Sequence, residues 1–358
     1  NIDGSLPPVS TSGTWTNTSG GTWGTGGNWL NNLADGSGKT ANFNTLNLTA
    51  DTTVTLDSAR TIGNLVVGDA DTSSAAGWTL AGSALTLAGG TPTLTVNALG
   101  DTKAVAISAA VAGSAGLTKA GTGKLTLSAA NTYSGTTTIS EGTLQVSDQP
   151  YFNMGRTTTV ASGAVFELYN SNNTFTSLMP VSTISGAGTF RLSGNSTINQ
   201  AENGVNGTRL TFAMDAGGWI DLLDTSRLTN GGWGVMNWTS NKASMNVASG
   251  ATLDVWDGQD VIIDALTGSG TVDKVHGGNS PRMLKVGIAD GSGTFSGTIG
   301  NTGGSLTLEK TGTGTQILTG TNTYSGATNV NSGTLQIGDG GTTGTLGSGP
   351  VTIASGAS

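Results

Sequence analysis

One segment of the chain occurs twice, and this internal repeat constrains the fold more than any other feature of the sequence. The first copy runs from Gly116 to Val146 and the second from Ser305 to Ile337. Each copy contains Asn-Thr-Tyr-Ser-Gly followed by Gly-Thr-Leu-Gln, and Lys119 matches Lys310 at the same shift of 191 residues. A repeated unit of this size predicts an architecture in which neighbouring units stack on one another.

Short alternations of apolar and polar residues lie between the Gly turns of each copy. Residues 124–127 are Lys-Leu-Thr-Leu, and residues 143–146 are Thr-Leu-Gln-Val. Alternation of this kind, bounded by Gly, Asn and Ser, predicts strands. Because each strand would have only about three to five residues, it would need its neighbours to bury its apolar face. We therefore expect an all-β chain: a right-handed, single-stranded parallel β-helix (β-solenoid) over residues 45–358, with Leu, Val and Ile inside.

The Tyr-Ser-Gly element of each copy is expected to form a corner of the coil. Tyr133 and Tyr324 are predicted to be structural aromatic residues rather than ligand contacts. Gly135 and Gly326 are predicted to adopt backbone angles that other residues resist.

The repeated segment resembles the passenger-associated transport repeat, also called the autotransporter-associated β-strand repeat. In the first copy the resemblance rests on Leu-x-Lys-x-Gly-x-Gly over residues 117–123, Asn-Thr-Tyr-Ser-Gly over 131–135 and Gly-Thr-Leu over 142–144, and the second copy has the same elements. The resemblance implies a secreted, surface-displayed β-helix from a bacterium of Gram-negative type. It implies no catalytic residue, because the repeat is a building unit.

The composition argues against several classes of function. The 358 residues include 59 Gly and no Cys, so disulfides, a thiolate nucleophile and Cys-based metal sites are excluded. The net charge is −8 and the basic residues form no stripe, which argues against nucleic-acid binding. No apolar run approaches the roughly 18 residues of a membrane-spanning helix. Only 10% of residues are charged, which suits a solenoid with neutral polar outer faces.

Residues 1–44 differ from the rest, because Trp15, Trp23 and Trp29 lie there in a Gly- and Asn-rich sequence. Rings spaced in this way could form a platform that stacks on sugars. We favour a cap, because the end of a solenoid exposes apolar interior and unpaired strand edges. This segment also resembles the start of other proteins that carry the repeat. We expect residues 1–44 to be an N-terminal cap or assembly segment.

A second concentration of large side chains lies between residues 200 and 242. Trp219, Trp233 and Trp238 either pack beneath longer coils or form a binding patch for a glycan or host-surface ligand.

Acidic residues are the remaining candidates for a site. Asp257 and Asp260 could project from one turn and bind calcium, although neither an EF-hand nor a nonapeptide calcium repeat is present. Some parallel β-helices cleave polysaccharides with paired carboxylates, and Arg282 and Lys285 follow closely. His276 is the only histidine; no nucleophile motif accompanies it, and we expect an exposed loop residue. We predict no catalytic residue and no cofactor.

Together these features predict a structural or adhesive extracellular protein, acting in surface display or in a fibre or matrix. We expect that it either continues in a longer precursor or self-associates end to end, with residues 1–44 of one copy covering residues 341–358 of another. The alternative is a glycan-binding or polysaccharide-degrading β-helix.

Overall fold

The computed structural model describes residues 11–100, 103–149, 157–171, 175–176, 182–199, 207–231, 234–256, 258–276 and 281–358. The chain divides into two compact units, Asn1–Gln149 with Asn153–Val165 and Pro150–Phe152 with Phe166–Ser358. Strands account for almost all of the regular structure. Within the described ranges, the single helical element is the 3-10 turn η1 (Gly26–Asn28).

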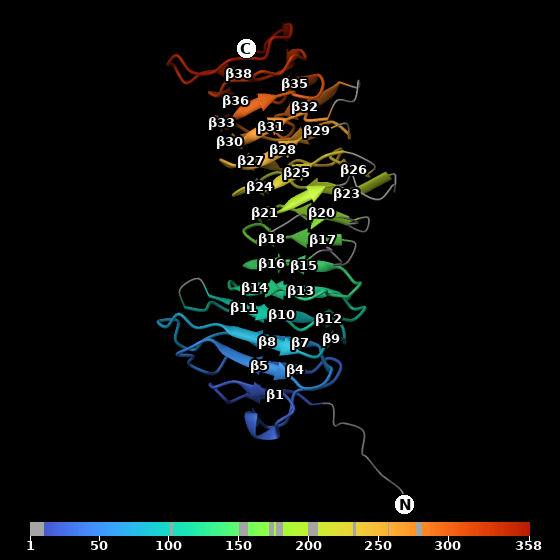
Figure 1. Ribbon diagram of the computed structural model, residues 1–358, viewed down its shortest axis with the longest axis vertical. Coiled ribbons are helices and arrows are strands. Elements are labelled where there is room, and N and C mark those ends of the chain that lie inside the picture. Colours follow the sequence, from blue (N-terminus) through green and yellow to red (C-terminus); the bar gives the residue numbers. More distant parts are fainter. Residues whose placement is uncertain are drawn as a thin grey trace, which may run out of the picture. The chain divides into compact units, whose positions relative to one another are not determined.

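The first unit contains three sheets whose strands succeed one another as the chain winds (Figure 1). The first sheet has the order β3 (Trp29–Leu30), β1 (Gly13–Trp15), β4 (Thr40–Phe43), β7 (Asn64–Val67), β10 (Thr93–Val96), β13 (Leu117–Ala120), β15 (Thr137–Ile139) and β17 (Thr157–Val160). The second has β2 (Gly21–Thr22), β5 (Thr52–Leu56), β8 (Trp78–Gly82), β11 (Ala104–Ile107), β14 (Lys124–Leu127) and β16 (Thr143–Ser147). The third has β6 (Arg60–Ile62), β9 (Leu85–Leu87) and β12 (Val111–Ala112).

The second unit contains four such series of strands. The first has β20 (Ser182–Gly186), β23 (Gly207–Met214) and β26 (Gly234–Asn237). The second has β18 (Val165–Asn170), β21 (Thr189–Gly194), β24 (Trp219–Leu222), β27 (Ser244–Val247), β30 (Leu266–Gly268), β33 (Gly293–Phe295), β36 (Thr315–Leu318) and β38 (Thr334–Ile337). A third series has β19 (Phe175–Thr176), β22 (Thr197–Asn199), β25 (Arg227–Thr229), β28 (Thr252–Asp254), β31 (Thr271–Asp273) and β34 (Thr298–Gly300). The fourth has β29 (Val261–Ile263), β32 (Arg282–Val286), β35 (Leu306–Lys310), β37 (Thr328–Val330) and β39 (Val351–Ile353).

Neighbouring strands in these series pair in parallel, as the sequence predicts for a β-solenoid. The antiparallel pair among the described strands is β1 with β3, where Trp15 lies opposite Trp29. Coil length varies more than expected. Leu65 and its partner Leu94 are 29 residues apart, whereas Gln316 and its partner Leu335 are 19 apart. The extra residues of the longer coils form loops, because the strands keep their register.

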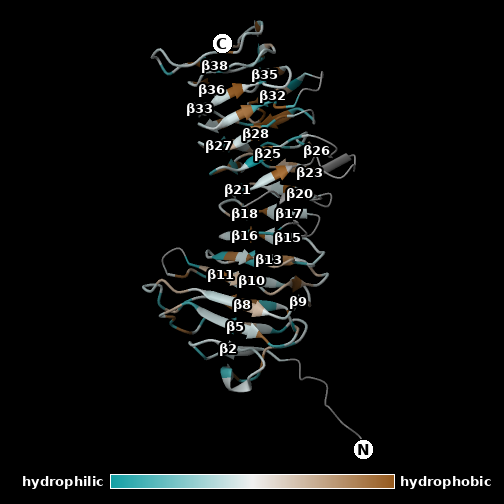
Figure 2. Cartoon of the chain, viewed as in Figure 1, coloured by the Kyte–Doolittle hydropathy of each residue, from teal (hydrophilic) through white to brown (hydrophobic). Residues whose placement is uncertain are grey.

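Side chains alternate between the interior and the outer face along the strands. In β5, Thr52, Val54 and Leu56 are buried, whereas Thr53 and Thr55 are exposed. Figure 2 shows the hydrophobic residues concentrated within strands. Full burial of one Val or Leu side chain contributes roughly 1.5–3 kcal/mol, so the stacked inward columns supply most of the stability of each unit. The all-β solenoid predicted from the repeat is confirmed.

An aromatic cluster lies at the start of the first unit. Trp15, Trp23 and Trp29 are buried. The ring centroid of Trp29 lies 5.1 Å from that of Trp15 and 4.9 Å from that of Trp23. All three rings lie 5.5 Å from the ring of Phe43. Each of the three indole N–H groups donates to a backbone carbonyl. Because Phe43 also contacts Trp78 of the following coil, the cluster continues directly into the solenoid interior. This packing is what a cap requires, and the boundary at residue 44 stays a prediction.

The two repeat copies contain a buried lysine that the sequence patterns do not explain. Lys119 faces the interior between Leu94 and Ile139 of the neighbouring coils. Its ammonium group donates to the carbonyls of Ala120, Gly121 and Glu141 at 3.0, 2.6 and 3.1 Å. The lysine therefore supplies hydrogen-bond donors to turn carbonyls on two successive coils. A purely apolar side chain has no donor and would leave these carbonyls without this partner.

The second copy repeats this arrangement. The Lys310 ammonium group donates to the carbonyls of Thr311, Gly312 and Ser332 at 2.5, 3.0 and 3.3 Å. Burial lowers the pKa of Lys310, and the nearby carboxylates of Asp290 and Asp264 oppose that shift.

The tyrosines of the repeat are structural, as expected. Tyr133 and Tyr324 are buried, and their hydroxyl groups lie 2.9 and 2.7 Å from the Oγ1 atoms of Thr137 and Thr328. Burial raises the pKa of both phenols. The asparagine two residues before each tyrosine accepts a backbone N–H from the preceding coil, with Val111 as the donor in the first copy and Ile299 in the second.

The explanation predicted for Gly135 and Gly326 is wrong. Neither has a positive φ; the repeat glycines that do include Gly121 at 76° and Gly142 at 65°. A Cβ on Gly135 would instead lie 2.2 Å from the backbone nitrogen of Gly116, and one on Gly326 would lie 2.3 Å from a backbone oxygen. Close approach of the preceding coil, rather than an unusual backbone angle, requires glycine there.

Candidate binding surface

The tryptophans proposed as a sugar-stacking platform do not share one location. Trp15, Trp23, Trp29 and Trp238 are buried, so their rings present no face to solvent. Trp238 continues an interior row of rings, stacking on Phe212 with a centroid separation of 4.7 Å. Trp233 lies outside the described residues. Trp15 and Trp29 lie within strands, whereas Trp23 and Trp238 directly follow one, so the sequence alone does not show that all four rings point inward.

Trp219 is the exception, because 37% of its side chain is exposed. It begins β24 and lies in register between Thr189 of β21 and Ser244 of β27. Its neighbours along the ladder are small, so the ring stands between short polar side chains on a β-sheet surface. A single ring in this setting can stack on one sugar ring, and Trp219 remains a proposed ligand contact.

Several aspartates of this region hold groups of the protein itself. Of the two considered for calcium, Asp260 accepts the backbone N–H of Met283 at 3.0 Å, and Asp257 lies outside the described residues. Buried Asp254 accepts a hydrogen bond from the Arg227 guanidinium group. Asp264 accepts the backbone N–H groups of two residues of a neighbouring coil. Within the described part of the chain, no three His, Cys, Asp or Glu residues gather as a metal site would require.

The same role recurs elsewhere along the chain. Asp51 accepts the backbone N–H of Gly77, and Asp290 accepts that of Thr313. The Lys103 ammonium group is the main cause that lowers the pKa of Asp51, whereas the Thr313 N–H is the main cause at Asp290. Aspartates therefore connect successive coils by binding amides that the strand ladders leave unpaired.

His276 is exposed, as expected, and its ring stacks on Trp256 at a centroid distance of 3.2 Å. Trp256 has a φ of 43° and lies against Gly231, where a Cβ would approach its Cγ atom to 2.5 Å. Of the two basic residues considered for catalysis, Lys285 forms an ion pair with Glu309 at 2.7 Å. The other, Arg282, opens β32 and lines a pocket.

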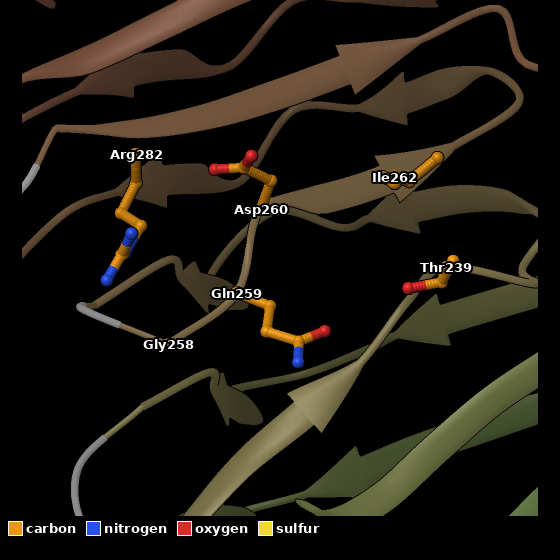
Figure 3. A pocket seen from close by; sticks show the side chains of 6 residues that line it. All are labelled: Thr239, Gly258, Gln259, Asp260, Ile262 and Arg282. Carbon is orange, nitrogen blue, oxygen red and sulfur yellow. The ribbon is translucent and has the colours of Figure 1, made fainter.

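This pocket of the second unit has a volume of about 330 Å³ (Figure 3). It is lined by Thr239, Gly258, Gln259, Asp260, Ile262 and Arg282. The sequence pattern identified Asp260 and Arg282 separately but could not bring them together with Thr239, because each comes from a different coil.

A second surface feature is the last coil of the second unit. In the preceding coil, the inward positions Gln316 and Leu318 are buried. Ile337, the ladder partner of Leu318, is 37% exposed. In the sheet of β37 and β39, Thr328 and Val330 are buried, whereas their partners Val351 and Ile353 are 49% and 57% exposed. Interior-type side chains thus form an apolar surface, which we call the open-coil surface.

The described part of the chain contains no helix with the length and hydropathy that a bilayer crossing demands.

Comparison with known proteins agrees with the geometry of the repeats. The family model of the passenger-associated-transport-repeat matches residues 117–146 and 308–337. These ranges hold Lys119 and Lys310 as well as Tyr133 and Tyr324. The chain is also 31% identical over 223 residues to the adhesin BmaC autotransporter of Brucella suis biovar 1 (strain 1330). That match covers 52% of this chain and 6% of the relative, so the chain corresponds to a small part of that protein.

No solved structure matches the chain significantly. The two repeats and the similarity to an autotransporter place the chain at the cell surface or outside the cell of a Gram-negative bacterium. The chain thus carries two copies of the passenger-associated-transport-repeat and is similar, over about half of its length, to part of an autotransporter.

Proposed function

We propose that the chain acts in adhesion, as part of a passenger that contacts a host or neighbouring surface. The observation that carries this proposal is the 31% identity to an adhesin over 223 residues. The structure supports it through the outer faces of the coils. In the first unit, Asn64, Thr93, Thr118, Thr138 and Thr159 follow one another in register on the outward side of one sheet. A scaffold of this kind presents polar side chains at the strand spacing of about 4.8 Å.

The proposed role is non-enzymatic. Paired carboxylates that could cleave a polysaccharide would need free oxygens facing one substrate. Asp254, Asp260 and Asp264 each hold a backbone N–H or a guanidinium group instead. This arrangement favours binding over turnover.

Adhesion is tested by coupling the folded chain to beads and measuring bead retention on cultured host cells and on extracellular-matrix proteins. The control is the same chain coupled after denaturation, which keeps composition and charge but loses the folded surface. We expect retention for the folded chain only. Equal retention of both preparations, or none for either, would count against an adhesive role.

We also propose end-to-end self-association, which the open-coil surface favours. Val351 and Ile353 are side chains of the interior type and expose about half of their surface. Edge strands with apolar side chains pair readily with another chain.

Self-association is measured by analytical ultracentrifugation of the purified chain over a range of concentrations. Ile353→Glu is expected to shift the chain towards monomer. Ile288→Glu is a matched control, because Ile288 is a 42% exposed isoleucine of the same unit away from β39. A wild-type chain that stays monomeric at high concentration would rule out this mode of assembly.

A further inference from the structure

The pocket of the second unit crosses three successive coils. Thr239 follows β26, residues 258–262 lead into β29, and Arg282 begins β32. In Figure 3 the Asp260 carboxylate lies on the side of Arg282, and the Gln259 amide extends towards the side of Thr239. Polar groups from separate coils therefore surround one space.

Hydrogen bonds from buried residues fix the walls of the pocket. Asn230 is fully buried; its side-chain amide donates to the carbonyl of Gln259 at 2.6 Å, and its own carbonyl accepts the Gly258 N–H at 3.1 Å. On the other side, the Asn241 amide donates to the carbonyl of Ile262 at 2.9 Å. Because these bonds hold the backbone of both walls, the pocket is formed before any ligand arrives.

The Asp260 side chain is held in place as well. Its Oδ1 atom accepts the Met283 N–H at 3.0 Å, which fixes the carboxylate against the next coil. The carboxylate has two oxygens and several lone pairs, so this bond leaves acceptor capacity for a ligand.

The nearby Trp256 is held by contacts within the protein. The His276 ring stacks on the Trp256 ring, and Gly231 lies close to the base of the indole. The backbone N–H of Trp256 donates to Oδ1 of Asp254 at 3.1 Å. His276 therefore covers one face of the Trp256 ring.

The lining groups select among classes of ligand. A divalent cation would want several oxygen ligands, whereas Asp260 is the one carboxylate among the described residues that line the pocket. A phosphate or other anion would be attracted by Arg282 but repelled by Asp260. An apolar ligand would find little beyond the Ile262 side chain. A neutral ligand with adjacent hydroxyl groups satisfies every wall, because a hydroxyl both donates to Asp260 and accepts from Arg282, Gln259 or Thr239.

We propose that this pocket binds a neutral sugar residue of a surface glycan; the proposal rests on the adhesive function put forward above. The volume of about 330 Å³ lies at the lower end of the range for small-molecule sites, which suits one or two sugar units.

The test uses the full chain and a panel of neutral sugars: galactose, N-acetylglucosamine, lactose and chitobiose, with sialyllactose and inorganic phosphate as anionic comparisons. Saturation-transfer NMR detects binding, and calorimetry gives the dissociation constant. We expect at least one neutral sugar to bind, and both anionic probes to bind more weakly.

Three variants locate the site. Asp260→Asn keeps an oxygen for the Met283 N–H while removing the charge, and Arg282→Gln removes the charge and leaves an amide donor on a shorter side chain. Each should weaken sugar binding by about tenfold or more, the usual effect of losing one hydrogen bond to a charged group. Ser240→Ala is the matched control, because Ser240 neighbours Thr239 in the chain and does not line the pocket. Circular dichroism confirms that each variant is folded.

Binding of no neutral sugar, equal binding by all variants, or stronger binding of phosphate would overturn the pocket assignment. The adhesion assay separates this failure from failure of the proposed function. Beads that adhere equally with wild-type chain and with Asp260→Asn would refute the pocket and leave adhesion standing. Sugar binding lost in Asp260→Asn, combined with beads that never adhere, would refute adhesion and leave the pocket standing.

Discussion

Replacing Lys119 by Met tests whether the repeat needs a buried cation. The Lys119 ammonium group donates to three carbonyls, and hydrogen bonds to charged groups contribute about 1.5–3 kcal/mol each. Burying an ammonium ion costs several kcal/mol, which offsets part of this gain. Methionine has a similar length and no donor, so it leaves the carbonyls without their partner. We expect the free energy of local opening of this coil to fall by about 2–4 kcal/mol.

Native-state hydrogen exchange measures this loss directly. Amides of β13, β14 and β15 should exchange about 30- to 1,000-fold faster in Lys119→Met, since 1.4 kcal/mol corresponds to a factor of ten. The control is Lys103→Met, which removes an exposed ion pair with Asp51 and should change stability by less than about 1 kcal/mol. Exchange rates in Lys119→Met equal to those of the wild type would refute the reasoning, because water would then satisfy the carbonyls.

The pKa of the same lysine provides a second readout. Burial lowers the pKa of Lys119 from 10.5 to about 8, and the nearby Glu141 carboxylate opposes the shift. Between these values the unfolded chain keeps a proton that the folded chain releases, so this group makes stability rise with pH from about 8 to 10.5. Carbon-13 NMR of the lysine Cε resonances should show one group titrating near pH 8, absent in Lys119→Met. Titration of every lysine near its ordinary pKa would contradict this picture.

Three further predictions concern individual contacts. Tyr324→Phe removes the hydroxyl contact with Thr328 and should lower stability by about 0.5–1.5 kcal/mol in urea unfolding; an unchanged midpoint would show that the hydroxyl contributes nothing. The Asp290 carboxylate has a lowered pKa, so its contribution is present above its ordinary pKa of 3.8 and is lost as pH falls through the folded value; Asp290→Asn should flatten the acid limb of a stability–pH profile, and an identical profile would argue against the contact. Gly135→Ala places a Cβ 2.2 Å from backbone and should destabilise by more than about 2 kcal/mol, whereas Gly27→Ala has no atom within 4 Å and should be nearly neutral in thermal unfolding; similar melting temperatures would mean that the coils can move apart.

The sequence was informative wherever the physics is local. Alternation along segments such as 124–127 follows from the two-residue period of a strand, so it correctly identified both the strands and their inward faces. The repeat of Asn-Thr-Tyr-Ser-Gly predicted stacking, and the structure confirms parallel coils. The structural role of Tyr133 and Tyr324 also followed from the residue type and the flanking glycine.

Other features depend on which coil covers which, and the sequence could not decide them. Gly135 looked like a residue chosen for its backbone angle, but a neighbouring backbone 19 residues away in sequence, at Gly116, excludes a side chain there. For Trp238 the sequence left packing and ligand binding both open, and the ring packs on Phe212 of the preceding coil. The sequence offered Asp260 as a ligand for a cation, and only the structure shows that the Met283 N–H of the next coil binds one of its oxygens.

By itself the sequence determined the class of fold, the inward and outward faces of the strands and the identity of the repeating unit, because these follow from short-range periodicity. Only the tertiary structure decided that Lys119 closes a turn from inside the solenoid, that Trp219 rather than Trp238 faces solvent, and that Thr239, Asp260 and Arg282 share a pocket. The physical reason is that coil length varies along the chain. A pattern shows which side of a strand is covered, but the side chain that covers it comes from a coil some 19 to 30 residues away, and the strand register sets that distance.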